Sequence, residues 1–310
     1  MQKLVIAGAG TMGTSMAQIF AACGFEVTLY DVYEQALDKS RQRLEQSVNT
    51  LVESGSISQE LGRETLGRIA FSSDKECFRA CQAVVENVVE DLQVKRGFFE
   101  EISRIVPESA ILATNTSGLS INSMAEVVHL PQRFIGMHWF NPPHLVLLVE
   151  IIKGDNTSDE TAQAIYDLCL QIGKKPVLVH KDVRGFAANR LQVALLREAL
   201  ALIGEGVVSP EGIDDILKYG LGSRWACVGP VETADLGGLD IWEHVCSYVS
   251  EDLSTDREFL KPLRERVERG ELGVKSGRGF YDYSGDKAER TLAERDRKML
   301  ALFNALHQEK

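Results

Sequence analysis

The stretch KLVIAGAGTMG, residues 3–13, decides the fold. Its first half is a short apolar run that predicts a buried strand, and its second half is a G-x-G-x-x-G pattern. Residues 12–23 then place apolar side chains at helical spacing, and EVTLYD at residues 26–31 predicts a second strand. A strand, a glycine turn, a helix and a strand in this order predict the opening of a parallel α/β sheet.

The glycine turn predicts a site for a dinucleotide. Gly8 permits a tight turn, Gly10 lets the backbone approach a pyrophosphate, and Gly13 allows the helix to pack close to the strand. Thr11 and Met12 open the helix, whose N-terminus offers unpaired N–H groups and the positive end of its dipole to phosphates. A glycine turn without a ligand is the alternative, but the flanking strand and helix are the context that the binding motif requires.

Asp31 ends the second predicted strand and completes this motif. A carboxylate at this place accepts hydrogen bonds from the hydroxyl groups of the adenine ribose and repels a 2′-phosphate. The sequence therefore predicts NAD, and not NADP, as the cofactor.

Alternating strands and helices continue to about Asp182. A polar stretch from about Glu34 to Leu66, broken near residues 54–58, predicts a helical hairpin inserted after the second strand. Apolar runs predict further strands at Ala83–Glu86, Ile111–Thr114, Phe134–His138, Leu147–Ile151 and Pro176–His180. Helical spacing predicts helices at Val94–Ile105, Ser120–Val128 and Asp159–Ile172. We therefore expect a Rossmann-type, doubly wound α/β sheet in residues 1–183.

The helical period dominates residues 184–310. It predicts helices at Asn189–Glu205, Gly212–Lys218, Leu239–Val249 and Leu260–Glu268. We therefore expect a second, all-α domain with its boundary near Val183. A chain of 310 residues with 44% hydrophobic side chains is long enough to bury the cores of two domains.

Composition excludes several classes of protein. The net charge is −11, and an acidic surface repels phosphate backbones, which argues against a nucleic-acid partner. No segment reaches the roughly 18 consecutive apolar residues of a membrane helix. The strand that begins at Lys3 leaves no room for a signal peptide, and the six cysteines fit no zinc motif and no disulfide framework. We expect a cytoplasmic protein that uses no metal and acts on a small molecule.

His138 and Glu150 are the candidate catalytic pair. His138 ends a predicted strand, and Glu150 interrupts the apolar run LVLLVEII, where a buried carboxylate needs a partner. Histidine can take a hydroxyl proton while hydride leaves the carbon, and a carboxylate on its other nitrogen stabilises the imidazolium. A structural role is the alternative for a histidine at a strand end, but the glutamate and the cofactor turn favour catalysis.

The chain resembles the 3-hydroxyacyl-CoA dehydrogenase family over essentially its whole length. The segments that carry the resemblance are GAGTMG at 8–13, VVENVVEDLQVK at 84–95, TNTSGLSI at 114–121, GMHWFNPP at 136–143, LVEIIKG at 148–154, DVRGFAANRL at 182–191, GPVETADLGGLD at 229–240 and GVKSGRGFYDY at 273–283. The resemblance implies reversible NAD-dependent oxidation of the 3-hydroxyl of a short-chain (S)-3-hydroxyacyl-CoA, in fatty-acid degradation or butanoate metabolism.

The resemblance also implies roles for single residues. His138 is the general base and Glu150 its partner. Ser117 and Asn189 hydrogen-bond the reacting oxygen, Asn189 from the helical domain. The residues around the nicotinamide and its ribose are Glu90, Lys95, Asn115 and Asn141.

The inserted hairpin resembles the part of the family fold that covers the CoA moiety. Arg63 or Arg68 could meet phosphates there, but a solvated helix face explains both arginines as well. The helical domain of the family forms the dimer interface, so the resemblance implies a homodimer. The apolar side chains of Leu191, Leu195 and Leu202 fit a dimer interface and an intramolecular core equally well.

Two segments differ from the short-chain acyl-CoA pattern. Leu147 stands where those members commonly carry lysine, and SRWACVGP at residues 223–230 replaces a shorter segment. This segment and NRLQ at residues 189–192 resemble the gulonate dehydrogenase, or lambda-crystallin-like, branch. One alternative is therefore an NAD-dependent dehydrogenase of a small non-CoA hydroxy acid or alcohol, of the gulonate, carnitine or pyridine-carboxylate type. A non-catalytic NAD-binding structural protein is another, although the intact set of predicted catalytic residues argues against it.

Overall fold

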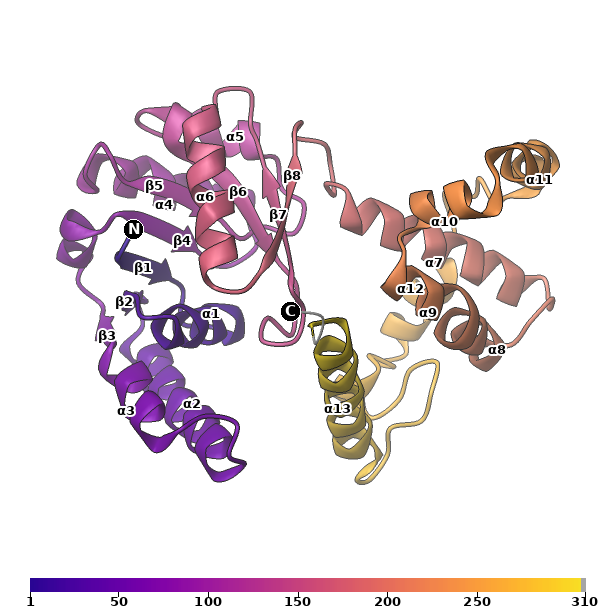
Figure 1. Ribbon diagram of the computed structural model, residues 1–310, viewed down its shortest axis with the longest axis horizontal. Coiled ribbons are helices and arrows are strands. Elements are labelled where there is room, and N and C mark those ends of the chain that lie inside the picture. Colours follow the sequence, from indigo (N-terminus) through magenta and orange to yellow (C-terminus); the bar gives the residue numbers. More distant parts are fainter. Residues whose placement is uncertain (308–310) are drawn as a thin grey trace. The chain divides into compact units, whose positions relative to one another are not determined.

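The computed structural model describes residues 1–307 of the chain (Figure 1). It contains two compact units, one comprising Met1–Arg190 and the other starting at Leu191. The first unit carries the sheet and the second is helical. The domain ranges 1–183 and 184–310 stay a prediction, because compact units are defined by contacts and domains by independent folding.

The first unit holds an eight-stranded sheet with the order β3-β2-β1-β4-β5-β6-β7-β8. Its strands are β1 (Lys3–Ala7), β2 (Glu26–Tyr30), β3 (Ile69–Ser72), β4 (Ala83–Glu86), β5 (Ile111–Thr114), β6 (Phe134–Trp139), β7 (Leu148–Ile152) and β8 (Lys175–Val179). Neighbouring strands run parallel except for β6 and β7, which are antiparallel. The predicted doubly wound α/β fold is confirmed, and its sheet is mixed rather than purely parallel.

Helices cover both faces of this sheet. They are α1 (Thr11–Ala22), α2 (Glu34–Glu53), α3 (Gln59–Gly67), η1 (Lys75–Ala80), α4 (Leu92–Ile105), α5 (Ile121–Ala125), η2 (Pro131–Arg133) and α6 (Asp159–Gln171). Residues of α1, α2 and α6 share one core with Leu4 and Ile6 of β1. Residues of η1, α4 and α5 share the other core with Val5 and Ala7. Because successive strand residues point to opposite faces, a strand buried on both faces is apolar throughout.

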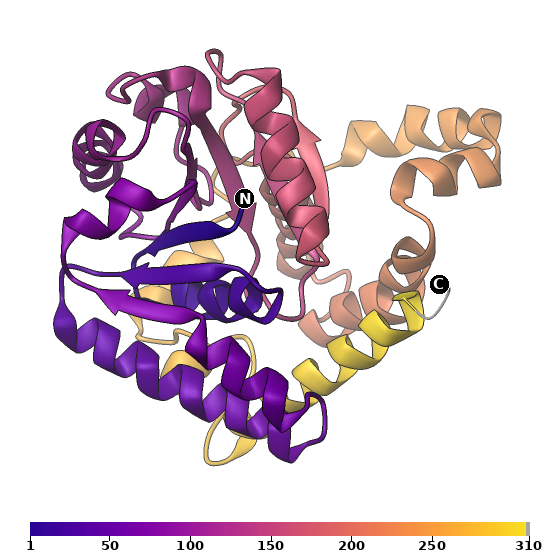
Figure 2. The same cartoon turned by 60° about the vertical axis from the view of Figure 1, so that its left-hand side comes forward.

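The predicted helical hairpin is confirmed as α2 and α3, which lie side by side (Figure 2). The N-cap residue of α3 is Ser58, whose Oγ accepts a hydrogen bond from the amide of Leu61 at 3.1 Å. Gly62 lies against α2, where an added Cβ would come within 2.9 Å of Val52 Cγ2. A small residue at this position therefore lets the two helices pack closely.

The second unit is helical, as predicted. Its elements are α7 (Ala188–Gly204), α8 (Pro210–Ile216), the π-helical turn η3 (Leu217–Leu221), α9 (Gly222–Cys227), α10 (Pro230–Gly237), α11 (Leu239–Asp252), α12 (Lys261–Glu268), η4 (Val274–Ser276) and α13 (Lys287–His307). Two isolated β-bridges, Gly273–Arg278 and Arg278–Asp282, lie between α12 and α13. Across residues 1–307, no helix is long and apolar enough to cross a membrane.

The fold makes a prediction about core stability. Phe99 of α4 has 0% exposure, and its ring centroid lies 4.7 Å from that of Phe134. Phe99→Ala should lower the free energy of unfolding by about 3–5 kcal/mol, because the removed ring leaves a cavity. Urea unfolding followed by circular dichroism measures the change. Glu100→Ala, at an exposed neighbouring position, should change the stability by less than about 0.5 kcal/mol, and equal losses in both variants would contradict the packing argument.

Candidate active site

The glycine turn between β1 and α1 has the shape that the predicted dinucleotide site requires. Gly8 has a φ of 105°, and a Cβ there would lie 2.4 Å from the carbonyl oxygen of Asn87. A Cβ on Gly13 would lie 1.9 Å from the carbonyl oxygen of Gly8. At Gly10, by contrast, no atom lies within 4 Å of an added Cβ. The chain itself therefore excludes side chains at Gly8 and Gly13, whereas Gly10 leaves open space, as the predicted approach of a pyrophosphate to its backbone requires.

The start of α1 offers donors to this open space. Gly10 is its N-cap residue and provides no side-chain cap. The first helical hydrogen bond of the backbone runs from the amide of Thr14 to the carbonyl oxygen of Gly10, at 2.9 Å. The amides of Thr11 and Met12 precede that bond and have no acceptor within the helix, so they are available to an anion.

Asp31 lies directly after β2, beside the same turn. Its Oδ2 accepts a hydrogen bond from the amide of Ala9 at 2.8 Å, and its Oδ1 accepts one from the amide of Tyr33 at 3.0 Å. Each carboxylate oxygen keeps a second lone pair for another donor. Two backbone contacts thus fix the carboxylate, while leaving it able to bind the hydroxyl groups of a ribose.

His138 and Glu150 face each other across β6 and β7. Nδ1 of His138 lies 2.9 Å from Oε2 of Glu150, and the two residues are 3% and 1% exposed. Residues directly opposite in an antiparallel pair point to the same face of the sheet, so the strand register itself creates this contact. The expected contact between the two side chains is therefore present.

Glu150 is held in its ionised form. Its Oε1 accepts hydrogen bonds from the amides of Ala187, at 3.0 Å, and Ala188, at 2.8 Å. Burial alone would raise the pKa of Glu150, but the hydrogen bonds from His138 and from the two amides outweigh it, so the pKa lies below its ordinary value. Because a carboxylate only accepts hydrogen bonds, Nδ1 of His138 is the donor, which leaves Nε2 as the free acceptor.

Aromatic rings flank the imidazole. The ring centroid of His138 lies 4.3 Å from that of Phe140 and 5.7 Å from that of Phe186. Phe186 has a φ of 51°, which is uncommon for a residue other than glycine. The two rings limit the contact of His138 with water, which strengthens its interaction with Glu150.

Ser117 and Asn189 come together at the carboxyl end of β5. Nδ2 of Asn189 donates a hydrogen bond to the carbonyl oxygen of Ser117 at 2.6 Å, and Ser117 is exposed. Asn189 lies in the first turn of α7, and the compact unit that carries the sheet includes it. The contact of both residues with a reacting oxygen stays a prediction.

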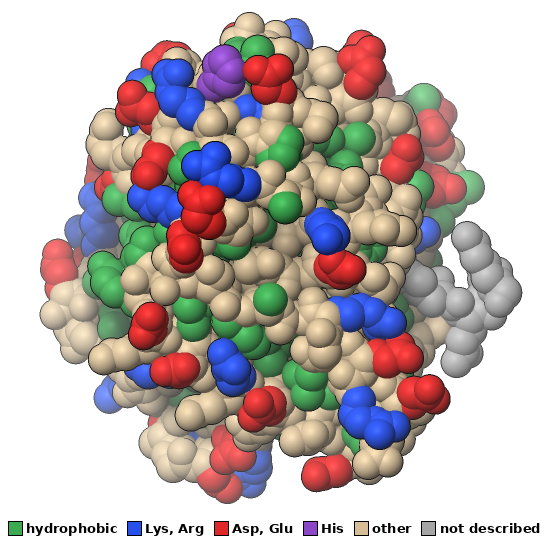
Figure 3. Space-filling model, turned by 90° about the vertical axis from the view of Figure 1, so that its left-hand side faces the viewer, with side chains coloured by type: hydrophobic (Ala, Val, Ile, Leu, Met, Phe, Trp, Pro, Cys, Tyr) green, Lys and Arg blue, Asp and Glu red, His purple; other side chains and the backbone are tan. Residues whose placement is uncertain are grey.

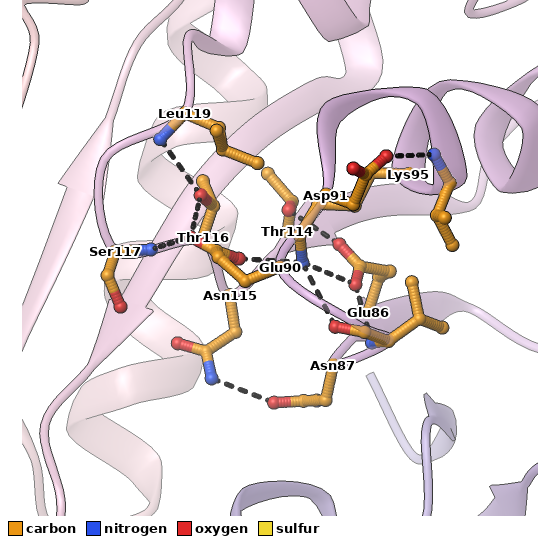
Figure 4. A network of polar contacts seen from close by, with 12 residues as sticks. Glu86, Asn87, Glu90, Asp91, Lys95, Thr114, Asn115, Thr116, Ser117 and Leu119 are labelled. Atoms are coloured by element: carbon orange, nitrogen blue, oxygen red, sulfur yellow. Dashed lines mark hydrogen bonds and ion pairs between the residues drawn. The ribbon is translucent and has the colours of Figure 1, made fainter. Parts of the chain in front are cut away.

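Glu90 and Lys95 belong to a polar network between β4, α4 and the segment after β5 (Figure 4). Nζ of Lys95 lies 2.6 Å from Oε1 of Glu86 and 3.2 Å from Oε2 of Glu90. Oε1 of Glu90 in turn accepts hydrogen bonds from the hydroxyl of Thr116, at 2.6 Å, and from the amide of Ser117, at 2.8 Å. The network therefore connects a buried ion pair to the backbone of Ser117.

The ammonium group of Lys95 is enclosed by its two carboxylate partners. Its side chain has 0% exposure and no free surface for a cofactor, whereas the side chain of Glu90 is 44% exposed. The places of Lys95 and Glu90 around the nicotinamide and its ribose stay predictions. Glu86 is a further buried residue of this network that was not predicted from the sequence, although it ends the apolar strand β4 much as Glu150 interrupts β7. Burial raises the pKa of Glu86 even though Lys95 is its partner.

Asn115 joins the ends of three neighbouring strands. Its Nδ2 donates to Oδ1 of Asn87, after β4, at 2.8 Å, and its Oδ1 accepts from the amide of Trp139, in β6, at 2.9 Å. Asn141 is exposed just beyond β6 and stays a predicted cofactor contact. These side chains lie at the carboxyl edge of the parallel strands, where open α/β sheets bind their ligands.

The hairpin shows no excess of positive charge. Arg68 is paired with Glu64 at 2.8 Å, and Arg63 is exposed. Residues 34–68 contain five basic and six acidic side chains. Basic and acidic side chains are also interspersed over the face that Figure 3 draws. The CoA contacts of the two arginines stay a prediction.

The site defines a class of enzyme. A buried imidazole with a free Nε2 can take a proton at the carboxyl edge of a sheet whose first turn accepts a dinucleotide, and Asp31 favours NAD. In the described part of the chain, no group of three or more His, Cys, Asp or Glu side chains could hold a metal ion. The protein is an NAD-dependent dehydrogenase.

Comparison with known proteins identifies the family. Residues 3–183 match the family model described as 3-hydroxyacyl-CoA dehydrogenase, NAD binding domain, and residues 185–283 match the model of its C-terminal domain. The chain belongs to the 3-hydroxyacyl-CoA dehydrogenase family, which confirms the resemblance seen in the sequence.

Two kinds of relative are similar to the chain. The 5-formyl-3-hydroxy-2-methylpyridine 4-carboxylate 5-dehydrogenase of Mesorhizobium japonicum is 35% identical, over 98% of each chain. A probable 3-hydroxybutyryl-CoA dehydrogenase of Deinococcus radiodurans is 39% identical, over 91% of this chain and 100% of the relative. A crystal structure of the pyridine-carboxylate enzyme matches with a TM-score of 0.91 at 34% identity, over 100% of both chains. A crystal structure of (S)-3-hydroxybutyryl-CoA dehydrogenase from Ralstonia eutropha matches with a TM-score of 0.77 at 36% identity, over 92% of this chain and 99% of the other.

The contacts of Asp31 predict a change of cofactor preference. Asp31→Ala should weaken NAD binding about tenfold and reduce the discrimination against NADP, because the variant neither binds the ribose hydroxyls nor repels a 2′-phosphate. Titration calorimetry with both dinucleotides measures the two dissociation constants. Asp38→Ala removes an exposed carboxylate from α2 and should leave both constants unchanged. An unchanged ratio of the two constants in Asp31→Ala would refute the ribose contact.

Proposed function

We propose that the protein catalyses the reversible NAD-dependent oxidation of the 3-hydroxyl of a short-chain (S)-3-hydroxyacyl-CoA to the 3-ketoacyl-CoA. The observation that carries this proposal is the 2.9 Å contact between Nδ1 of His138 and Oε2 of Glu150, at the ligand-binding edge of the sheet. The acyl-CoA substrate is supported by the matched family models and by the 3-hydroxybutyryl-CoA dehydrogenases among the relatives. Fatty-acid degradation and butanoate metabolism are the pathways in which such a reaction takes place.

His138 moves the proton in this mechanism. Its Nε2 accepts the proton of the substrate hydroxyl, and its Nδ1–H remains bonded to Glu150. The ionised carboxylate stabilises the imidazolium that forms, and in the reverse direction His138 returns the proton to the oxygen. NAD, when bound at the glycine turn, would supply the acceptor for the hydride. Glu150 itself keeps its charge throughout, because its other oxygen is bound by the amides of Ala187 and Ala188.

Ser117 and Asn189 orient the reacting oxygen in this proposal. The side-chain amide of Asn189 has two N–H donors, and the bond to the carbonyl oxygen of Ser117 uses one of them. The second donor and the exposed hydroxyl of Ser117 are free to bind the substrate oxygen. Glu90 also holds the backbone of Ser117, because its Oε1 accepts a hydrogen bond from the Ser117 amide at 2.8 Å.

A second candidate function is the oxidation of a small non-CoA substrate that carries a carboxylate. The observation that favours it is the close match to the pyridine-carboxylate dehydrogenase over the complete chain. That match includes the region of α13, which lies beyond the C-terminal family model. The balanced charge of the hairpin also fits a substrate without the phosphates of CoA.

We also propose that the protein forms a homodimer through its helical unit. Large apolar side chains on α7, α10 and α11 are each more than 60% exposed, namely Leu191, Val231, Leu236 and Leu239. Exposed apolar surface of this kind marks sites of protein association. The mass of the protein in solution, from light scattering, tests this part of the proposal.

A substrate assay distinguishes the two candidate functions. With NADH and acetoacetyl-CoA, we expect turnover of roughly 1–1000 per second, the ordinary range for an enzyme on its own substrate. The loss of NADH absorbance measures it. The control reactions offer a pyridine-carboxylate aldehyde in the same assay with NADH, and gulonate or carnitine with NAD. Negligible turnover of acetoacetyl-CoA together with turnover of one of these would replace the first candidate with the second.

The proposed base is tested by replacing His138, whose Nε2 is the proposed proton acceptor. His138→Gln should lower kcat about 100-fold or more, because amides do not act as bases near neutral pH, whereas the dissociation constant of NAD should stay the same. Steady-state assays of NADH absorbance measure kcat, and titration calorimetry measures the dissociation constant of NAD. His129→Gln changes an exposed histidine and should retain the activity of the unmodified protein. A loss of less than tenfold in His138→Gln would mean that another group is the base.

A further inference from the structure

Lys174 is a buried lysine that has no part in the proposed proton transfer. It lies between α6 and β8 and is 4% exposed. Its Nζ donates hydrogen bonds to the carbonyl oxygens of Pro143 and, at 2.8 Å, Val146. The same nitrogen lies 5.1 Å from the ring centroid of Trp139. All three of these partners lie in β6 or in the β6–β7 loop, which comprises residues 140–147.

The surroundings of Lys174 are unusual for a buried charge. Among the side chains that the structure describes, no carboxylate lies within ion-pair distance of its ammonium group. Burial lowers the pKa of Lys174 to about 8, and its neighbours Cys169 and Cys23 oppose this shift only in part. A buried cation without a counter-ion is unfavourable unless dipoles compensate it, so the two carbonyl groups and the indole ring are its compensation.

The β6–β7 loop needs such a partner for its carbonyl groups. The amides of Leu145 and Val146 both donate to the carbonyl oxygen of Pro142, at 3.1 and 3.0 Å, and thereby close a turn. This turn satisfies amides but leaves the carbonyl oxygens of Pro143 and Val146 to an outside donor. Lys174 is that donor, and charge-assisted hydrogen bonds are stronger than neutral ones.

The loop is also directly connected to the catalytic pair. It joins the two strands that carry His138 and Glu150, and Phe140 at its start packs on the imidazole with 4.3 Å between the ring centroids. A shift of the loop therefore moves Phe140 against His138. A displacement of about 1 Å in a catalytic group is enough to lower a rate about 100-fold.

We propose that Lys174 is a positioning residue of the active site, whose ammonium group holds the β6–β7 loop in the conformation that fixes Phe140 against His138. This inference rests on the proposed function, because it assigns Lys174 to the reaction that His138 catalyses. It assigns no contact between Lys174 and a substrate or cofactor.

The test compares two neighbouring lysines. Lys174→Met keeps a long side chain but removes the charge and the donors, whereas Lys175→Met changes an exposed side chain at the start of β8. Phe99→Ala serves as a second control, because it destabilises the core without touching the loop. For each variant, kcat, the dissociation constant of NAD and the hydrogen exchange of the amides in residues 140–147 are measured.

In Lys174→Met we expect kcat to fall about 10- to 100-fold, NAD binding to stay within about twofold, and amide exchange in the β6–β7 loop to become faster. Lys175→Met should match the unmodified protein in all three measurements. At temperatures where it is folded, Phe99→Ala should have the same kcat as the unmodified protein. Its amide exchange in the β6–β7 loop should also be unchanged.

Two outcomes would overturn the proposal. One is a Lys174→Met variant with unchanged kcat and unchanged loop exchange; the other is a loss of kcat that Phe99→Ala reproduces. If Lys174→Met does not fold, Lys174→Gln is measured against the same criteria. If the unmodified protein oxidises or reduces none of the candidate substrates, the proposed function fails, whereas hydrogen exchange still tests whether Lys174 holds the loop.

Discussion

The antiparallel pairing of β6 with β7 is the constraint on which the active site depends. In this register His138 lies directly opposite Glu150, so the backbone ladder itself brings the imidazole and the carboxylate to 2.9 Å. A parallel neighbour of β6 would enter the sheet from the other end and would need a crossover connection. The short β6–β7 loop is possible only because the chain reverses here. The antiparallel pair in this otherwise parallel sheet thus carries the two residues proposed to catalyse the reaction.

Buried charges at the carboxyl edge are stabilised in three different ways. Glu150 is bound by an imidazole and two amides, and its pKa is lowered. Glu86 is bound by Lys95, yet burial still raises its pKa. Lys174 has carbonyl groups and an indole ring in place of a counter-ion. In each case the charge connects separate segments of backbone, so the unfavourable desolvation is offset by bonds that also fix the geometry of the site.

Much of the fold could be predicted because strands buried on both faces give continuous apolar runs. β4 and β5 were located at their exact bounds for this reason, and the hairpin was found from its helix-favouring polar stretch. The strand β7 was predicted at Leu147–Ile151, but the sequence does not reveal strand direction, so its antiparallel pairing with β6 could not be predicted. A lysine in a sequence motif does not show whether its head group is exposed or buried, so the enclosure of Lys95 between Glu86 and Glu90 could not be predicted.

The groups that would bind the phosphates of NAD differ from those that would bind the phosphates of CoA. In a chain with a net charge of −11, the pyrophosphate of NAD is met by amides at a helix end, which need no basic side chain. CoA phosphates would instead require free cations on the hairpin. Arg68 is paired with Glu64 and Arg41 lies over the ring of Phe71, so the cations available there are reduced. The proposed hydride chemistry therefore depends on side chains of the sheet, whereas the proposed CoA contacts would depend on side chains of the hairpin, which the His138–Glu150 pair does not constrain.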